Sequence, residues 1–478
     1  MPSRGGSGRE GLSPAIARDP EGRPGRDGGQ GERRHRGRSG AGCGRQWGSA
    51  PARRPHPTPP TGAERRRERL RAAQLAPARP SPSFAEHPAY LEITRGRALT
   101  RLAGLRDPYY RRHEGRAGPH TRLDGRALLN FTSYDYLGLN GHPEVLAAHR
   151  EAAERFGTTV SGSRLTSGER EVHAALEAAL AETYAAEAGL LFVSGHATPA
   201  SLFQAILGPG DLILHDALMH NCAVVGAAGV RCHRRAFRHN DLDHLERMLA
   251  RSRHEHGHVL IVTEGLFSMD GDGAPLEALL RIKERYGAWL MVDEAHALGT
   301  LGHTGRGSHE HAGIDPARVD IWFGTLSKAL VSCGGYVCGS RALIDILRAR
   351  APGLVYSVGM PAPTAAASLA ALRIMRREPE RVARLQALSS RFHEGLRRAG
   401  AEMGTAWGVA ILPAIIGTDL ATLQAAEALE ARGVLAFPVV QPGVPEGAAR
   451  LRFFISAAHR EEELDQALAA IGEVLPRR

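Results

Sequence analysis

Short apolar runs alternate with amphipathic stretches over the middle of the chain, between about residues 189 and 325. The apolar runs are too short for helices and predict buried strands. The stretches between them repeat apolar residues every three or four positions, which predicts helices packed on one face. Strands that alternate with helices in this way favour a mainly parallel sheet covered on both faces. The apolar runs are GLLFVSG, DLILHD, HVLIVTEG, WLMVDEA and VDIWFG.

Residues typical of helix ends, and a second pattern of a helix followed by strands near the C-terminus, complete the domain prediction. Pro199 lies in the first turn of one predicted helix, Asp241 opens the next and Gly287 closes a third. A long helical pattern after residue 359 precedes the strand-like GVAILPAIIG and ARLRFFISAAH, which favours a smaller α/β domain. We therefore expect an N-terminal segment at 83–140, a large domain at 141–362 and a small C-terminal domain at 363–478.

The first 80 residues differ in composition from the rest of the chain. They hold 18 arginines, no lysine and 7 acidic residues, whereas the net charge of the whole chain is +10. A segment rich in Gly, Pro and Arg buries too little apolar surface to order itself, so residues 1–82 are expected to be a disordered extension. Within it, AERRRERLRAAQL favours a short helix. An Arg-rich arm can bind nucleic acid or acidic membranes, but without interleaved aromatic residues a solvated extension is favoured, and we expect no nucleic-acid partner.

Cysteine usage and the longest apolar runs bear on the compartment. The five cysteines are odd in number and form no CxxC pair, which favours the reducing cytosol. No apolar run approaches the roughly 18 residues of a membrane-spanning helix, and the N-terminus lacks the apolar core of a signal peptide. We expect a cytoplasmic protein without a membrane span.

Polar side chains follow five of the predicted strands. In an open parallel sheet, ligands bind outside the carboxyl ends of the strands, so these side chains are expected at one rim. They are Ser194 and His196, then His220, then Glu264 and Ser268, then Asp293 and His296, and finally Thr325 and Lys328.

Lys328 stands out because lysine is rare in this chain. Of 61 cationic residues, only Lys283 and Lys328 are lysines. A primary amine can form a Schiff base with an aldehyde, which a guanidinium cannot do, so a reactive role is one interpretation. A free lysine is almost fully protonated at pH 7, and such a site must lower its pKa or hold it as an imine. The alternative is a leftover surface lysine in an arginine-rich chain.

Asp293 ends an apolar strand, where its carboxylate needs a cation or a donor. A pyridinium nitrogen would meet that need, and pyridoxal phosphate enzymes pair such an acid with a Schiff-base lysine. The letters DEAH at 293–296 also occur in helicase-type NTPases. Those enzymes require a phosphate loop ending in GK[ST], and neither lysine lies in one.

Three further patterns each allow two interpretations. His220 could be a satisfied core histidine or a ring that stacks on a planar cofactor. The start of SGHATPASL offers backbone N–H groups for phosphate, although small residues before a helix are common. Arg450 and Arg452 share one face of a strand and could bind a carboxylate as a fork or form surface salt bridges. The remaining histidines lack ligand spacing, so we expect no metal.

Eight ordered stretches resemble the α-oxoamine synthase family of fold-type I pyridoxal phosphate enzymes. They are NFTSYDYLGL, GTTVSGSRLTSGEREVHAALEAALAE, LFVSGHAT, HDALMHN, TEGLFSMDGD, WLMVDEAHALGTLGHTGRG, FGTLSKAL and RLRFFISAAH. The family includes 8-amino-7-oxononanoate synthase, 2-amino-3-ketobutyrate CoA ligase, 5-aminolevulinate synthase and serine palmitoyltransferase. The resemblance runs from about Leu128 to the C-terminus. It implies an α/β transferase with a mainly parallel, seven-stranded type of sheet in a large domain and a smaller C-terminal α/β domain.

The resemblance also implies roles for individual residues. Lys328 would form the Schiff base with pyridoxal 5'-phosphate, and Asp293 would pair with its pyridine nitrogen. His296 would approach the phenolic oxygen, and His220 would stack on the ring. The other cofactor-binding positions would be Thr325, Ser194, Gly195, His196, Ser268 and Ser357, the last of these lent by the neighbouring subunit of a homodimer.

For the substrates, the resemblance implies an amino acid and an acyl thioester, either acyl-CoA or an acyl carrier protein. Arg452, and less closely Arg450, match the position that binds the amino-acid carboxylate. Tyr134 lines the substrate pocket, where biotin-pathway members have Asn and serine palmitoyltransferases tend to have Tyr. The expected reaction condenses glycine, alanine or serine with the acyl group and releases carbon dioxide and free thiol. An aminotransferase or amino-acid lyase on the same fold is the alternative, and it would need no thioester.

Overall fold

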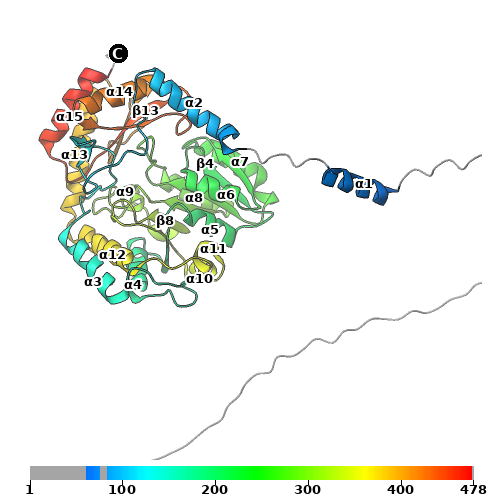
Figure 1. Ribbon diagram of the computed structural model, residues 1–478. Helices are drawn as coiled ribbons and strands as arrows, with labels where there is room; N and C mark the ends of the chain where they lie inside the picture. Colours follow the sequence, from blue (N-terminus) through cyan, green and yellow to red (C-terminus); the bar gives the residue numbers. More distant parts are fainter. Residues whose placement is uncertain (1–60, 76–82, 476–478) are drawn as a thin grey trace, which may run out of the picture. The chain divides into compact units, whose positions relative to one another are not determined.

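The computed structural model describes residues 61–75 and 83–475, and the chain divides into two units, Met1–Ser81 and Pro82–Arg478 (Figure 1). In the first unit, α1 (Gly62–Leu75) confirms the predicted short helix. Thr61 and Glu64 form a capping box at its start, because the side chain of each residue accepts the backbone N–H of the other. The disorder predicted for the rest of 1–82 concerns residues outside the described ranges.

The second unit is built on a seven-stranded sheet with the strand order β3-β9-β8-β7-β6-β4-β5. Strands β5, β4, β6, β7 and β8 run parallel, and β9 is antiparallel to both of its neighbours. This arrangement confirms the predicted fold class. The strands are β3 (Ala188–Phe192), β4 (Leu212–Asp216), β5 (His233–Phe237), β6 (Val259–Glu264), β7 (Trp289–Asp293), β8 (Ile321–Thr325) and β9 (Gly335–Gly339).

Both faces of this sheet are covered, which explains why its central strands read as continuous apolar runs. Leu260 and Val262 of β6 belong to one apolar cluster, whereas Val259 and Ile261 belong to another on the opposite face. Helices α5 (Thr198–Ile206), α6 (Asn221–Ala228) and α10 (Arg341–Arg350) cover the first face. Helices α4 (Glu171–Thr183), α7 (Leu242–Ser252), α8 (Leu276–Tyr286) and α12 (Ala362–Arg377) cover the second.

Two smaller sheets complete the unit. The antiparallel sheet β10-β13-β12 lies with the last helices of the chain, and the sheet β1-β2-β11 joins the N-terminal segment to them through the parallel pair of β2 and β11. The strands are β1 (His120–Leu123), β2 (Arg126–Asn130), β10 (Ile411–Gly417), β11 (Val434–Leu435), β12 (Phe437–Val439) and β13 (Ala449–Phe454). The predicted boundaries near residues 140 and 362 stay a prediction, since residues from Pro82 onwards form one compact unit.

Further helices surround these sheets, and α12 packs against α3 and α4 in the lower part of Figure 1. They are α2 (Pro88–Leu102), α3 (Pro143–Phe156), α9 (Ser308–Ala312), α11 (Pro352–Val355), α13 (Glu380–Arg398), α14 (Asp419–Ala431) and α15 (Glu461–Val474). Three single 3-10 turns are η1 (Phe84–Glu86), η2 (Arg253–Glu255) and η3 (Pro316–Arg318). Within residues 61–75 and 83–475, no helix combines the length and the apolar character needed to cross a membrane.

Two strands of the seven-stranded sheet had no counterpart in the sequence prediction. Strand β5 lies at the edge of the sheet and reads His-Arg-Arg-Ala-Phe, with only its last residue buried, so no apolar run marks it. Strand β9 is buried throughout but begins and ends with glycine, which leaves only three residues of strand-like sequence. Both belong to the sheet because of pairing with neighbours that are distant in sequence.

Candidate active site

The carboxyl ends of β3, β4, β6, β7 and β8 lie at one edge of the sheet, and the predicted polar residues follow them there. Glu264 and Asp293 are register partners on adjacent strands. These groups share one electrostatic environment, since the charge of Lys328 acts on the pKa of Asp293, of His220 and of His296. The predicted convergence on a single rim is thus present in the structure.

Lys328 follows β8 in a tight turn, in which its carbonyl accepts the N–H of Val331 over 2.9 Å. Its Nζ lies 5.8 Å from the centre of the Tyr134 ring. Burial lowers the pKa of Lys328 to about 8, although the charges of Asp293 and Glu264 oppose that shift. Near neutral pH, a useful fraction of this amine is therefore unprotonated and nucleophilic.

Asp293 and Glu264 are buried side by side on neighbouring strands. Asp293 Oδ1 accepts the N–H of Ala295 over 2.8 Å, and burial raises the pKa of Asp293 to about 6. Glu264 Oε1 accepts the backbone N–H of His220 over 2.6 Å. Burial and the charge of Asp293 raise the pKa of Glu264 well above its usual range. Two buried carboxylates this close oppose each other's ionisation, which disfavours a second negative charge on the pair.

His220 caps the N-terminus of α6, because its Nδ1 accepts the N–H of Cys222 over 3.2 Å. That bond places the ring proton on Nε2. Burial, together with the charge of Lys328, lowers the pKa of His220 to about 4, so the ring is neutral. His220 therefore makes the hydrogen bond to backbone that is typical of a structural histidine. Its ring still lies at the rim, where it could stack on a planar cofactor.

His296 is also neutral, because burial and then the charge of Lys328 lower its pKa well below the usual range. The Tyr136 hydroxyl lies 2.7 Å from His296 Nδ1. The imidazole is nearly parallel to the Phe454 ring, at 6.2 Å between centres. Tyr136 and Phe454 were not predicted as site residues. Tyr136 could have been found from its spacing, since it lies two positions after Tyr134.

The turn after β3 and the end of β8 bring small polar groups together. A Cβ at Gly195 would lie 2.6 Å from Thr325 Oγ1, so only glycine allows this approach. Thr325 Oγ1 lies 2.7 Å from Ser327 Oγ, and Ser194 Oγ accepts the N–H of Ala197 over 3.2 Å. These hydroxyls stand before the first turn of α5, where free N–H groups favour an anion. His196 is exposed beside them, with Nε2 3.2 Å from Asn221 Oδ1.

Arg450 and Arg452 both contact the loop at Ser268–Asp270, but their partners differ. Arg450 Nη1 donates to Asp270 Oδ1 over 2.7 Å and to Met269 O over 3.0 Å. Arg452 Nη1 donates to Ser268 O over 2.9 Å, while its buried Nε finds no partner among the described residues. The salt-bridge interpretation therefore fits Arg450, and the carboxylate-binding interpretation fits Arg452.

The remaining predicted residues lie at different distances from this rim. The Tyr134 ring packs edge-on against Phe454 at 4.8 Å between centres and borders Lys328. Ser268 is buried and faces the rim through its contact with Arg452. Ser357 lies on an exposed loop after α11, and its hydroxyl donates to Val358 O over 3.1 Å instead of to a rim residue.

A cleft of about 500 Å³ opens at Lys328 and leads towards the N-terminal segment. Its walls include Ser133, Tyr134, Asn140, Ser327, His113 and Arg116. Arg116 is exposed, and no carboxylate of the described residues lies within ion-pair distance of it. A cation without a partner in the cleft was not predicted, because Arg116 lies far from Lys328 in the sequence.

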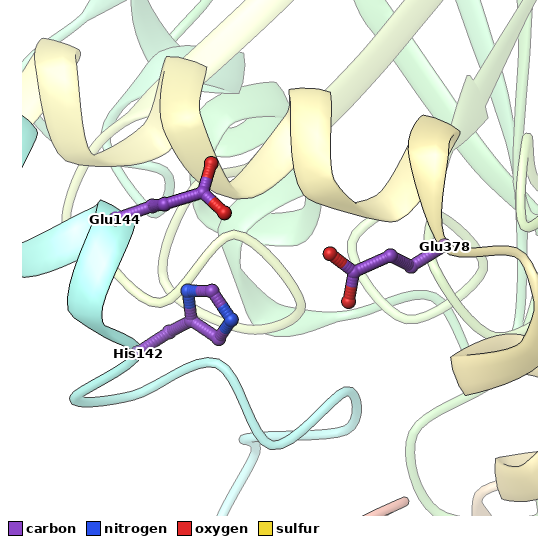
Figure 2. Close-up of side chains that lie close together, drawn as sticks. All are labelled: His142, Glu144 and Glu378. Atoms are coloured by element: carbon purple, nitrogen blue, oxygen red, sulfur yellow. The ribbon is translucent and has the colours of Figure 1, made fainter.

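One group of side chains has the spacing of metal ligands. His142, Glu144 and Glu378 place ligand atoms within 4.8 Å of one another, and Figure 2 shows the imidazole below the two carboxylates. Both carboxylates, however, pair with Arg377 over 2.6 Å, and Glu378 also pairs with Arg381 over 2.7 Å. Two guanidinium groups thus neutralise the two acids, which removes the charge that would attract a cation. The absence of a metal stays a prediction.

Comparison with known proteins decides the family. The model of the family "Aminotransferase class I and II" matches residues 126–471. The 8-amino-7-oxononanoate synthase of Methylobacterium nodulans is 44% identical over 381 residues, which cover 79% of this chain and 96% of that protein. The corresponding enzyme of Anaeromyxobacter sp. is 44% identical over 359 residues, which cover 75% of this chain and 89% of that one. The chain belongs to the α-oxoamine synthase family.

Solved structures agree with this assignment. The serine palmitoyltransferase of Sphingomonas wittichii has a TM-score of 0.78 and 30% identity, and covers 82% of this α-oxoamine synthase and 98% of its own chain. Another serine palmitoyltransferase, solved with pyridoxal phosphate, has a TM-score of 0.79 and 26% identity over 82% of this chain and 98% of that one. The protein is a pyridoxal-phosphate-dependent acyltransferase that condenses an amino acid with an acyl thioester and loses carbon dioxide.

The rim fits this cofactor. Lys328 offers an amine of lowered pKa, and the charge of Asp293 lies close enough to raise that pKa. The approach of Gly195 to Thr325 leaves a cradle of hydroxyls at the start of α5. An aldehyde, a pyridine nitrogen and a phosphate each find suitable chemistry in this one region.

Proposed function

We propose that this α-oxoamine synthase condenses alanine with a seven-carbon acyl thioester that ends in a carboxylate. The observation that carries the proposal is the 44% identity to enzymes named for their product, 8-amino-7-oxononanoate. In that product the amine on C8 and the methyl C9 correspond to alanine after loss of its carboxyl group. The ketone at C7 and the carboxylate at C1 correspond to the acyl chain, which therefore carries seven carbons and a terminal charge.

The base is Lys328. Lys328 would hold pyridoxal phosphate through its amine until the amino acid displaces it, and the cofactor would then supply the electron sink for a carbanion at the amino-acid α-carbon. Lys328 Nζ takes the α-proton and returns a proton after decarboxylation, a role that suits a pKa of about 8. The Asp293 carboxylate would hold the proton on the pyridine nitrogen, and the raised pKa of the neighbouring Glu264 disfavours a second negative charge there.

The two neutral histidines hold the ring in place. With the Tyr136 hydroxyl donating to Nδ1, His296 carries its proton on Nε2 and would offer it to the phenolic oxygen of the cofactor. His220 presents a flat, uncharged ring for stacking, because its Nδ1 is engaged by the N–H of Cys222. Ser194, Gly195 and Thr325 would hold the phosphate, with His196 at its margin, whereas Ser268 lies beside Arg452.

Arg452 binds the amino-acid carboxylate. Its buried Nε, which has no hydrogen-bond partner in the part of the chain that the structure describes, and its contacts with Phe454 and Ser268 support this role. Arg450, which already pairs with Asp270, supports the strand next to it. The acyl chain enters the cleft beside Lys328, where the unpaired Arg116 meets the terminal carboxylate.

We also propose that the enzyme is a homodimer. Leu165, Tyr356 and Val358 are apolar yet 65%, 87% and 48% exposed, which is unusual for neighbouring large side chains. Their two loops are joined, since Gly359 N donates to Gly162 O and Ser163 Oγ donates to Val355 O, both within 2.9 Å. Ser357 lies between the exposed residues, so a partner that covers this patch would receive Ser357 in its own site.

The four described cysteines form no disulfide, which supports a reducing cytoplasm.

A second candidate is condensation of serine with a long acyl thioester. It is supported by Tyr134, by its packing beside Lys328 and by the structural similarity to serine palmitoyltransferases. The two candidates predict different preferences for the amino acid and for a charged acyl terminus.

Release of free thiol tests these proposals directly. The purified enzyme is mixed with alanine, glycine or serine and with a seven-carbon carboxyacyl-CoA or palmitoyl-CoA, and the products are weighed by mass spectrometry. We expect thiol release and an α-amino ketone with alanine and the carboxyacyl-CoA. Preference for serine and palmitoyl-CoA would favour the second candidate, and amino-group transfer without thiol release would favour an aminotransferase.

A further inference from the structure

His239 lies between two buried carboxylates close to the rim but outside the machinery described above. Its Nδ1 is 2.9 Å from Asp216 Oδ1, and its Nε2 is 3.0 Å from Asp272 Oδ2. Both acids are buried, and the His239 side chain is only 21% exposed. Because each ring nitrogen faces a carboxylate oxygen, both carry a proton, and the ring is an imidazolium.

The first carboxylate belongs to the turn that leads to His220. Asp216 ends β4, and its oxygens accept the N–H groups of Leu218 over 2.8 Å and of Asn240 over 2.9 Å. The turn between Asp216 and His220 is therefore fastened by the same carboxylate that pairs with His239.

The second carboxylate closes the loop that holds Arg452. The backbone carbonyl of Asp272 accepts the N–H of Phe267 over 2.7 Å, and its Oδ2 accepts the Thr405 hydroxyl over 2.6 Å. Within the loop from Phe267 to Asp272, the backbone carbonyl of Ser268 accepts a hydrogen bond from Arg452 Nη1 over 2.9 Å. A continuous path of contacts thus runs from His239 through Asp272 and the 267–272 loop to Arg452.

We propose that His239 is a positioning residue that fixes the 267–272 loop, so that Arg452 is held ready for the amino-acid carboxylate. This inference rests on the proposed role of Arg452. A cation is required at this point because two buried carboxylates without one would repel each other or protonate, and the loop would lose its anchor. The imidazolium joins the end of β4 to the 267–272 loop through one contact on each ring nitrogen.

Steady-state kinetics of His239→Gln test the proposal, since glutamine keeps the polarity but loses the charge and the second fixed donor. We expect the KM for the amino acid to rise at least tenfold, while the KM for the acyl thioester changes less than twofold and kcat less than threefold. In an Arg452→Gln background, the His239 substitution should have no further effect on that KM, because it acts through Arg452.

The matched control is His258→Gln. His258 also pairs with a carboxylate, Asp211, over 3.0 Å, but it lies at the opposite end of β6 and is 57% exposed. This variant should leave all three kinetic constants unchanged. An equal rise in the amino-acid KM in both histidine variants would overturn the proposal, as would full additivity of His239→Gln with Arg452→Gln.

Hydrogen exchange gives a readout that does not depend on turnover. In His239→Gln, the peptide that spans residues 265–275 should exchange faster than in the unchanged protein, and this should not occur in His258→Gln. If His239→Gln does not fold, Thr405→Val removes one contact of Asp272 and should raise the amino-acid KM and the exchange of the same peptide. Unchanged exchange together with an unchanged KM would overturn the inference.

Absence of thiol release in the unchanged enzyme would instead refute the proposed reaction, and the exchange data would still decide the role of His239 in holding the loop.

Discussion

Lys283 donates to Asp320 over 2.7 Å, whereas Lys328 has no carboxylate within ion-pair distance among the described residues. The first lysine is a structural cation on α8 that pairs with the segment before β8. The second is surrounded by buried groups that lower its pKa to about 8. The reactivity of Lys328 thus depends on desolvation at a strand end as well as on its being a primary amine.

The pH dependence of cofactor attachment follows from this pKa. In cofactor-free enzyme, the rate of covalent attachment to Lys328 should rise with pH and reach half its maximum near pH 8, because only the neutral amine reacts. Asp293→Asn should move this midpoint to lower pH, since the Asp293 charge stabilises the protonated amine. The visible absorbance of the attached cofactor measures the rate. Lys328→Arg is the control, and attachment to that variant at any pH would contradict the assignment.

Arg116 should determine the preference for a charged acyl terminus. Arg116→Gln should raise the KM for the seven-carbon carboxyacyl-CoA about fivefold, which corresponds to roughly 1 kcal/mol for an exposed ion pair. The KM for alanine should not change, because Arg452 binds that carboxylate. Heptanoyl-CoA, which lacks the terminal charge, is the matched substrate. A similar loss with both thioesters would show that Arg116 does not recognise the terminal carboxylate.

At the scale of elements, the site depends on how closely the turn after β3 approaches the end of β8. Glycine is required at position 195 because there is no room for a side chain, and not because of an unusual backbone angle. A Cβ on residue 195 would lie 2.6 Å from Thr325 Oγ1 and 3.0 Å from Thr325 Cβ. Both segments are backbone turns at the ends of buried strands, so neither can move away without disturbing the sheet.

Gly195→Ala should therefore weaken cofactor binding. Pushing Thr325 out of place should raise the dissociation constant for pyridoxal phosphate by at least about tenfold, the cost of modest overpacking. Equilibrium dialysis of the cofactor measures this change. Gly208→Ala is a suitable control, because a Cβ at that position meets nothing within 4 Å. Equal cofactor affinity in the two variants would argue against a phosphate site at this turn.

The predictability of the elements follows their burial. Strands β4, β6, β7 and β8 were predicted because sheets covered on both faces need continuous apolar runs. The edge strand β5 escaped prediction because most of its side chains face solvent. The helix ends at Asp241 and Gly287 were also predictable, since a carboxylate that accepts an N–H and a left-handed glycine are local devices.

At the scale of the whole molecule, the exposed patch at Leu165, Tyr356 and Val358 predicts assembly. Tyr356→Asp places a charge in the proposed dimer interface and should convert the dimer into monomers. Light scattering coupled to size-exclusion chromatography measures the mass, and thiol release should fall together with it. Tyr110→Asp is the control, because Tyr110 is 98% exposed but lies outside the patch. A monomeric unchanged enzyme with full activity would contradict the proposed exchange of Ser357.

The sequence by itself determined the fold class, the family and the polar residues that follow the strands, because apolar runs, helix ends and the residues after strands are properties of short segments. Only the tertiary structure decided which of two neighbouring arginines pairs with a carboxylate of the described residues. Arg450 and Arg452 are two positions apart in one strand, and their partners lie about 180 positions earlier in the chain. The same holds for the charge of His239 and the hydrogen bond from Tyr136 to His296. Hydrogen bonds and pKa values depend on groups that folding brings together, and no local pattern records those partners.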